Sequence, residues 1–162
     1  MTPDTFAFAT PPDEPVIEFR RVFKAPPSLI FQMFTDSDHV RQWWGPRVLE
    51  LVTCEIDLRV GGSYTFVLRA PDGQQFAMNG IYQEITAPHR LASTFTLDVA
   101  PDNEIAQSFT FEDVDGGTLL HGIDRHHSIE ARNQQIENGM MEAGLADQYL
   151  RLAELVESLP AL

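Results

Sequence analysis

Apolar and polar residues alternate through most of the first two-thirds of the chain, a pattern typical of strands that bury one face. A first strand is expected over residues 16–23, where Ile17, Phe19 and Phe23 alternate with more polar positions. Between residues 47 and 125, turn signals recur at strand-length spacing and divide the region into six further segments. The pattern therefore predicts a curved antiparallel sheet of six to seven strands. The turn signals are Gly61-Gly62, Pro71-Asp72-Gly73, Pro88, Pro101-Asp102-Asn103 and Asp115-Gly116-Gly117.

Two short helices are expected directly after the first strand. Pro26-Pro27-Ser28 can open the first helix, because proline is tolerated in a first turn. Asp36 or Ser37 can cap a second helix, which should end before Gly45-Pro46. Helices this short cannot form a bundle, so they are expected to cover one end of the sheet.

The period changes to a helical one after residue 129 and stays helical to residue 159. Apolar residues there recur at intervals of three to five, which predicts one long C-terminal helix. Gly139 and Gly144 interrupt it, each at a cost of about 1 kcal/mol relative to alanine. Two such costs predict a kink, or a close approach to a ligand or to the sheet.

The 162 residues are expected to form a single domain over residues 15–162, preceded by a mobile tail over residues 1–14. The tail is rich in proline, threonine and acidic residues, although Phe6 and Phe8 could dock onto the body. No internal repeat or linker is visible.

The negative charge of the chain limits the classes of partner that it can bind. The formal net charge is -13 and the isoelectric point is about 4.6, so nucleic-acid phosphates and anionic lipid headgroups would repel it. The single cysteine, Cys54, lies in a strand-like run and reads as a buried apolar thiol. With no signal-peptide core and no membrane span, the protein is expected to be cytoplasmic and not inserted in a membrane.

Taken together, these positions resemble the START-like, helix-grip superfamily (SRPBCC), an α+β class in which a curved antiparallel sheet wraps around a C-terminal helix. Within it, the chain is most similar to the branch named for the activator of the heat-shock-protein-90 ATPase, over residues 16–159. Leu145 stands where many members carry tryptophan, and only a short tail stands in place of the additional N-terminal domain of the full activator. The matching features are Ala25-Pro26, Thr35-Asp36, Trp43-Trp44-Gly45-Pro46, Gly61-Gly62, Asp72-Gly73, Gly80, Glu84-Ile85, Arg90-Leu91, Gly117-Thr118 and Gly139-Met140.

The resemblance implies a cavity between sheet and long helix that accepts apolar or amphipathic small molecules. The alternative is that the same aromatic and methionine side chains pack as a solid core. Of the two neighbouring tryptophans, one should anchor the short helix and the other should sit at the rim. The candidate lining residues are Trp43, Trp44, Tyr64, Phe66, Met78, Tyr82, Phe95, Phe109, Phe111, Met140 and Gly144, with His126 and Glu84 as possible polar groups at the mouth.

Metal or acid–base chemistry has one candidate segment, which contains His121, Asp124, His126 and His127. On an extended strand, His121 and Asp124 point to opposite faces, so they cannot converge without a bulge. Glu84 near Arg90 reads as a surface ion pair. No nucleophile elbow, metalloprotease motif, phosphate-binding loop or dinucleotide fingerprint is present, and we expect no catalytic residue, metal or cofactor.

The leading hypothesis is a non-enzymatic domain that binds or senses a small hydrophobic or amphipathic molecule. A second hypothesis is a co-chaperone-like protein-interaction module, suggested by the family resemblance and the acidic surface. A third is a cyclase- or hydrolase-type enzyme on the same fold, with His126, Tyr82 or Glu84 as acid–base groups. The chain is expected to be a monomer or homodimer that binds no nucleic acid.

Overall fold

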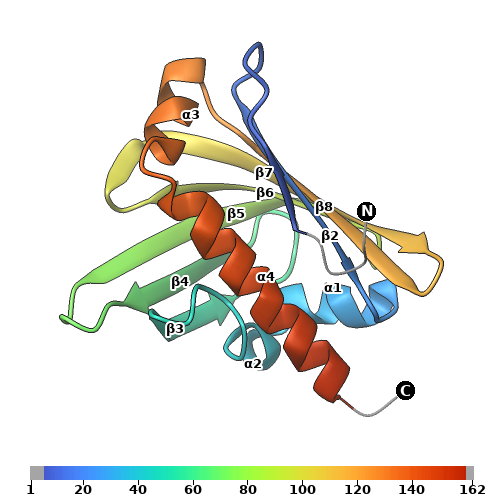
Figure 1. Cartoon of the computed structure of the whole chain (residues 1–162). Helices are drawn as coiled ribbons and strands as arrows, with labels where there is room; N and C mark the ends of the chain where they lie inside the picture. The colour runs from blue at the N-terminus through green and yellow to red at the C-terminus, as the bar shows by residue number, and fades with distance from the viewer. Residues whose placement is uncertain (1–5, 160–162) are drawn as a thin grey trace.

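A computed structural model describes residues 6–159 as one curved antiparallel sheet with a long helix lying across one of its faces (Figure 1). The α+β class and the helix-grip arrangement are as predicted. The strands are β1 (Ala7–Ala9), β2 (Val16–Phe23), β3 (Glu50–Ile56), β4 (Ser63–Arg69), β5 (Gln75–Thr86), β6 (Arg90–Leu97), β7 (Ala100–Val114) and β8 (Gly117–Arg125). The helices are α1 (Pro27–Thr35), α2 (Ser37–Val40), α3 (Ile129–Ile136) and α4 (Met140–Ser158).

The eight strands lie in the order β1-β2-β8-β7-β6-β5-β4-β3, and all neighbours are antiparallel. The described chain thus has one strand more than the six to seven predicted. The additional strand is β1, where Ala7 pairs with Arg20 of β2, inside the segment expected to be a mobile tail. Phe6 stacks on Tyr149 of α4 with ring centroids 6.3 Å apart, which explains how this segment is held against the body.

The two short helices form where the sequence places them. Pro27 is the first residue of α1, and the Asp36 carboxylate accepts a hydrogen bond of 2.9 Å from the backbone N–H of Asp38 at the start of α2. These helices lie beneath one end of the sheet (Figure 1).

The C-terminal helix differs from the prediction of one continuous helix over residues 129–159. It is broken into α3 and α4 because Gly139 adopts φ +72°, the left-handed conformation that ends a helix. Ser128 caps α3 by accepting a hydrogen bond of 3.0 Å from the Ala131 N–H.

The core lies between the sheet and α4 and is dominated by aromatic rings. Tyr149 of α4 is 1% exposed and stacks on Phe19 of β2 and Phe34 of α1, with centroids 5.5 and 6.3 Å apart. Phe19 fits against the sheet because its neighbour on β8 is Gly122, where a Cβ would lie 2.2 Å from the Phe19 ring.

Candidate functional site

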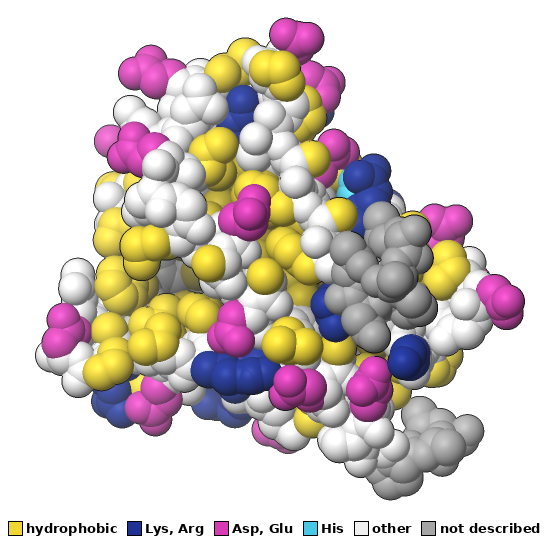
Figure 2. Space-filling model, viewed as in Figure 1, with side chains coloured by type: hydrophobic (Ala, Val, Ile, Leu, Met, Phe, Trp, Pro, Cys, Tyr) yellow, Lys and Arg dark blue, Asp and Glu magenta, His cyan; other side chains and the backbone are white. Residues whose placement is uncertain are grey.

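A small hollow lies on the inner face of the sheet, between strands β4 to β7 and the segment from α1 to Trp44, with a volume of about 20 Å³. A void of this size has room for roughly one water molecule. Hydrophobic side chains gather on the face of the molecule that carries α4 and on the strands beside it (Figure 2). The residues that line the hollow are Phe34, Trp44, Tyr64, Phe66, Tyr82, Leu91, Ser93, Gln107 and Phe109.

The strand pleat directs most of these side chains inward. Successive residues of a strand point to opposite faces, so alternate positions of β4, β6 and β7 converge on one side of the sheet. Five of the nine lining residues were predicted from the sequence, and Phe34, Leu91, Ser93 and Gln107 were not. The five are Trp44, Tyr64, Phe66, Tyr82 and Phe109.

The hollow has polar groups on its sheet side. The hydroxyls of Tyr64 and Ser93 form a hydrogen bond of 2.9 Å, and both side chains are buried. Burial raises the pKa of Tyr64 and of Tyr82 well above that of an exposed phenol. Both phenols therefore stay neutral at physiological pH and can donate hydrogen bonds.

Asp124 lies behind Gln107 and is 3% exposed. The Nε2 of Gln107 donates a hydrogen bond of 2.8 Å to Oδ1 of Asp124, its register partner across β7 and β8. Burial raises the pKa of Asp124 to about 7, and the hydrogen bond from Gln107 opposes that rise. The carboxyl group is thus poised to change its charge near neutral pH.

The sequence offered a signal for Asp124 that the sequence analysis did not use. Alternate residues of β8 point inward, and the series Thr118, Leu120, Gly122 and Asp124 ends with an acid at an inward position. His121 lies on the other face, where its Nε2 is 3.3 Å from the Glu18 carboxylate. His121 and Asp124 therefore do point to opposite faces, as the pleat predicts.

The two halves of α4 are buried to different extents. The C-terminal half is buried at Gln148, Tyr149 and Leu152, whereas Met140 at the N-terminal end is 72% exposed. The first buried position lies two turns into the helix, and Leu145 of the N-terminal half is only partly buried against the core.

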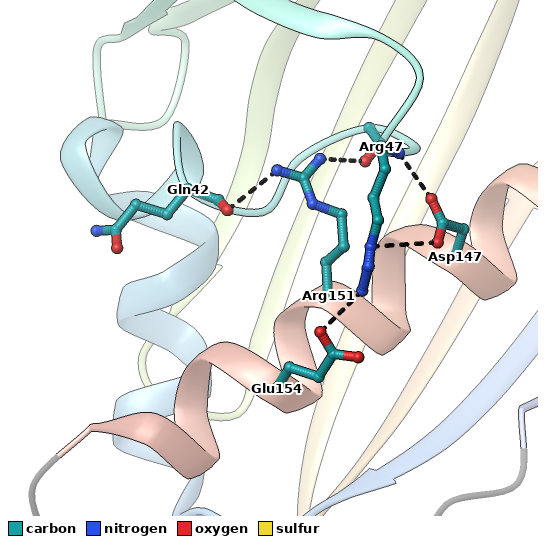
Figure 3. Close-up of polar contacts among 6 residues, drawn as sticks. Gln42, Arg47, Asp147, Arg151 and Glu154 are labelled. Atoms are coloured by element: carbon teal, nitrogen blue, oxygen red, sulfur yellow. Dashed lines mark hydrogen bonds and ion pairs between the residues drawn. The ribbon is translucent and has the colours of Figure 1, made fainter.

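Two arginines fasten the C-terminal half of α4 to the loop that follows α2 (Figure 3). Arg151 donates hydrogen bonds to the carbonyl oxygens of Gly45 at 2.7 Å and Gln42 at 3.2 Å. The backbone N–H of Arg47 donates to Asp147 at 2.7 Å, and the Arg47 guanidinium pairs with Glu154 at 2.9 Å. We call these contacts, together with the 2.9 Å bond from the Gly45 N–H to Gln148, the latch.

The latch matters to the hollow because the loop it holds carries Trp44. The Trp44 ring lies 4.9 Å from that of Phe66 and 5.3 Å from that of Trp43. Trp43 is fully buried, and its Nε1 donates to the Met33 carbonyl at 2.9 Å. Trp43 thus anchors the short helices and Trp44 lines the hollow, which answers the question that the sequence left open.

The remaining predicted residues lie elsewhere. Phe111 is fully buried in the core, and Phe95 is buried farther along the inner face of β6. Met78 is partly buried, and Met140 is exposed at the start of α4. A Cβ on Gly144 would lie 3.9 Å from Cγ of Pro46, so the helix passes near the loop without requiring glycine there.

The two predicted polar groups are not at the hollow. Glu84 accepts a hydrogen bond of 2.9 Å from Arg90 on the exposed surface. His126 is 3% exposed, and neither of its ring nitrogens has a hydrogen-bond partner among the described residues. Burial lowers the pKa of His126 to about 4, so the ring is neutral.

Cys54 is buried, and desolvation raises the pKa of its thiol to about 11, which makes it a poor nucleophile. Within residues 6–159, no group of three or more histidine, cysteine, aspartate or glutamate side chains is arranged to hold a metal ion. None of the helices in the described part of the chain is long and apolar enough to cross a membrane.

A curved antiparallel sheet gripping a C-terminal helix, with an aromatic hollow on the inner face of the sheet, is the arrangement of the START-like class. Residues 24–157 match the model of the Activator of Hsp90 ATPase homolog 1-like protein family, and the chain belongs to this family. No curated protein matches the chain.

Solved bacterial structures share the fold over nearly their whole length. A Rhodobacter sphaeroides protein superimposes with a TM-score of 0.87 at 22% identity, covering 96% of this chain and 100% of that one. A Mycobacterium smegmatis protein gives 0.83 at 23% identity, with coverage of 96% and 98%. A Silicibacter pomeroyi protein titled AHSA1 gives 0.72 at 21% identity, with coverage of 88% and 97%. At these identities the likeness establishes the fold.

Proposed function

We propose that the chain binds a small amphipathic molecule in the hollow on the inner face of its sheet. The observation that carries this proposal is the aromatic hollow with hydrogen-bonding groups on its sheet side. Such a combination of apolar walls and a few polar groups is typical of small-molecule sites.

The size of the hollow sets a condition on this function. About 20 Å³ does not hold a ligand of ten or more heavy atoms, so binding requires the walls to separate. No lining residue belongs to α4, but the N-terminal half of this helix lies beside the loop that follows Trp44, with Gly144 near Pro46. This half has no fully buried residue, and Gly139 and Gly144 allow its backbone to move. The ligand would therefore enter by displacing residues 140–146 beside this loop, while the latch, which begins at Asp147, holds the rest of α4.

The test compares ligand-induced stabilisation in the wild type and in a variant whose hollow is filled. A panel of uncharged, cationic and anionic aromatic compounds is screened by thermal shift, and the hits are checked by native mass spectrometry. A ligand that binds only the folded state must raise the melting temperature. If no compound of any charge raises it, the proposal fails.

Ser93→Leu places a larger side chain in the hollow and should abolish the shift produced by any hit. Thr94→Leu is the matched control, because residue 94 lies on the opposite face of the same strand. Both variants are first checked for cooperative unfolding in urea, since overpacking alone can cost about 1–3 kcal/mol.

A protein-interaction role is the second candidate, because the hollow is so small and the surface carries exposed apolar residues. Val48 is 65% exposed and Met140 is 72% exposed. This role predicts that the chain co-purifies with a chaperone and changes its ATPase rate, whereas ligand binding predicts neither.

A further inference from the structure

We infer that the ligand carries a positively charged nitrogen, held by the aromatic rings of the hollow with the Asp124 carboxylate as its counter-charge. This inference rests on the proposed function and specifies the chemical class of the ligand. Three observations support it: the aromatic rings that line the hollow, the buried carboxyl group of Asp124, and the absence of positive charge among the lining residues.

Six of the nine residues that line the hollow are aromatic. Their rings meet at tilted angles, with centroids 4.9 Å apart for Trp44 and Phe66, 5.2 Å for Tyr64 and Phe66, and 5.0 Å for Tyr64 and Tyr82. The faces of aromatic rings carry negative electrostatic potential and attract ammonium groups, most strongly where water is excluded. Separating these rings to admit a ligand would surround its polar group with such faces.

Asp124 supplies the second element. Its side chain has one hydrogen-bond partner in the described chain, Gln107, and Gln107 itself lines the hollow. No ion pair between Asp124 and a lysine or arginine is present within residues 6–159. A buried carboxylate without a cation is costly, so a cationic ligand one side chain away would provide what the fold does not.

The surrounding charge excludes the opposite class of ligand. None of the nine lining residues is positively charged, and the whole chain carries a net charge of -13. A carboxylate or phosphate would lose its water with no counter-charge nearby. The field of the protein would also slow the approach of an anion and favour that of a cation.

Asp124 is the buried acid beside the hollow, and its pKa is raised to about 7. Burial raises the pKa of Tyr64 on β4 and of Tyr149 on α4, and lowers that of His126 to about 4, so these three stay neutral. On β2, the register partner of Asp124 is Ile17.

Two buried arginines lie on the elements around Asp124, one on α3 and one on β2. Arg132 of α3 is committed to the carbonyl oxygens of Pro11, Glu14 and Val16. Arg21 lies four residues along β2 from Ile17, about 13 Å away at the rise of a strand. The charge of Asp124 therefore controls the preference for a cation.

Three naphthalene probes of matched shape test the inference: naphthylmethylammonium, naphthylmethanol and naphthoate. Their dissociation constants for the full chain are measured at pH 8 by calorimetry and by quenching of tryptophan fluorescence. The ammonium probe should bind about tenfold more tightly than the alcohol, and the naphthoate most weakly. At pH 7 the ammonium probe should release protons from Asp124, seen as a heat that depends on the buffer, whereas the alcohol should release none.

Asp124→Asn should reduce the preference for the ammonium probe over the alcohol to about threefold or less, with the alcohol affinity unchanged. Glu112→Gln removes one negative charge from the exposed face of β7 and should keep the full preference, which controls for the net charge of the chain. In the wild type, lowering the pH from 8 to 5.5 should remove the preference as Asp124 gains its proton, and this measurement needs no variant.

The outcomes separate the two proposals. If the alcohol or the naphthoate binds as tightly as the ammonium probe, the inference about charge is overturned while ligand binding stands. A preference that stays near tenfold in Asp124→Asn, or in the wild type at pH 5.5, also overturns it. If none of the three probes binds, the proposed function fails and the inference fails with it.

Discussion

The two halves of α4 lie on the same sheet but are held in opposite ways. The C-terminal half buries Tyr149, Leu152 and Val156 and carries the latch, whereas the N-terminal half begins with an exposed methionine and follows a left-handed glycine. One half is thus part of the core and the other is a cover (Figure 1). Because local stability follows buried contacts, we expect the N-terminal half of α4 to open locally more readily than the C-terminal half.

The largest effect should come from the fixed half. Tyr149→Ala removes a side chain that packs on Phe19, Phe34 and Trp43, and should lower the free energy of unfolding by about 3–5 kcal/mol. Met140→Ala in the covering half should change it by less than about 0.5 kcal/mol. Urea denaturation measures both, and equal costs would contradict the contrast between the halves.

The next largest effect on the free energy of unfolding comes from Asp124 and depends on pH. Because the pKa of Asp124 is raised on folding, its ionisation disfavours the native state: the cost is absent below the pKa of an unfolded aspartate, near 4, and complete above about 7. Asp124→Asn should therefore raise the free energy of unfolding by up to about 4 kcal/mol at pH 8 and by almost nothing at pH 4.

His126 also makes stability depend on pH, because its pKa is lowered on folding. Its neutral form stabilises the native state above about pH 6.5, and this contribution is lost as the pH falls toward 4. The two groups oppose one another between pH 4 and 6.5, so the difference between Asp124→Asn and the wild type isolates the aspartate. If the difference in the free energy of unfolding between Asp124→Asn and the wild type does not grow with pH, the pKa of Asp124 is not raised on folding.

A smaller effect is expected at the latch. Arg151→Met keeps the apolar stem but removes the bonds to the Gly45 and Gln42 carbonyls, and should cost about 1–2 kcal/mol. Arg47→Met removes exposed ion pairs and should cost less than about 1 kcal/mol. The rate of hydrogen exchange in residues 42–47 should rise more in Arg151→Met than in Arg47→Met. A larger rise in Arg47→Met would show that the ion pairs of Arg47 hold the loop more strongly than the hydrogen bonds of Arg151.

Small effects of opposite sign should come from the two glycines of the covering half. Gly144→Ala has room for its methyl group and should stabilise the domain by about 0.5–1 kcal/mol. Gly139→Ala should instead destabilise it by about 1–2 kcal/mol, because alanine is strained at φ +72°. Thermal unfolding measures both, and Gly144→Ala should also slow ligand association in stopped-flow experiments if this half must bend.

Much of the fold could be predicted because strand alternation, turn residues and helix caps are local signals. Asp36 capping α2 and the inward series in β4 are examples. The break at Gly139 was read as a kink within one helix, since sequence does not reveal which of two glycines adopts a positive φ. The strand β1 was missed because three residues with no polar alternation pair only through the backbone of β2.

The site was less predictable than the fold because a pocket is made by residues from distant segments. Trp44 and Tyr64 follow from aromatic character and strand parity, but parity does not separate Phe111 in the solid core from Phe109 at the hollow. Asp124 and Gln107 meet through the register of β7 and β8, and neither side chain is unusual within its own segment. Hydrophobic patterns therefore predict the apolar lining of a site more readily than its polar groups.

Arg132 of α3 reaches across more than a hundred positions of sequence to carbonyl oxygens at residues 11, 14 and 16. A shortened chain beginning at Val16 would lack two of these acceptors and leave the buried guanidinium with fewer hydrogen bonds. A truncation designed from the expected mobile tail would cause this loss. Residues 11–16 are thus bonded to the domain by a side chain that lies far from them in the sequence.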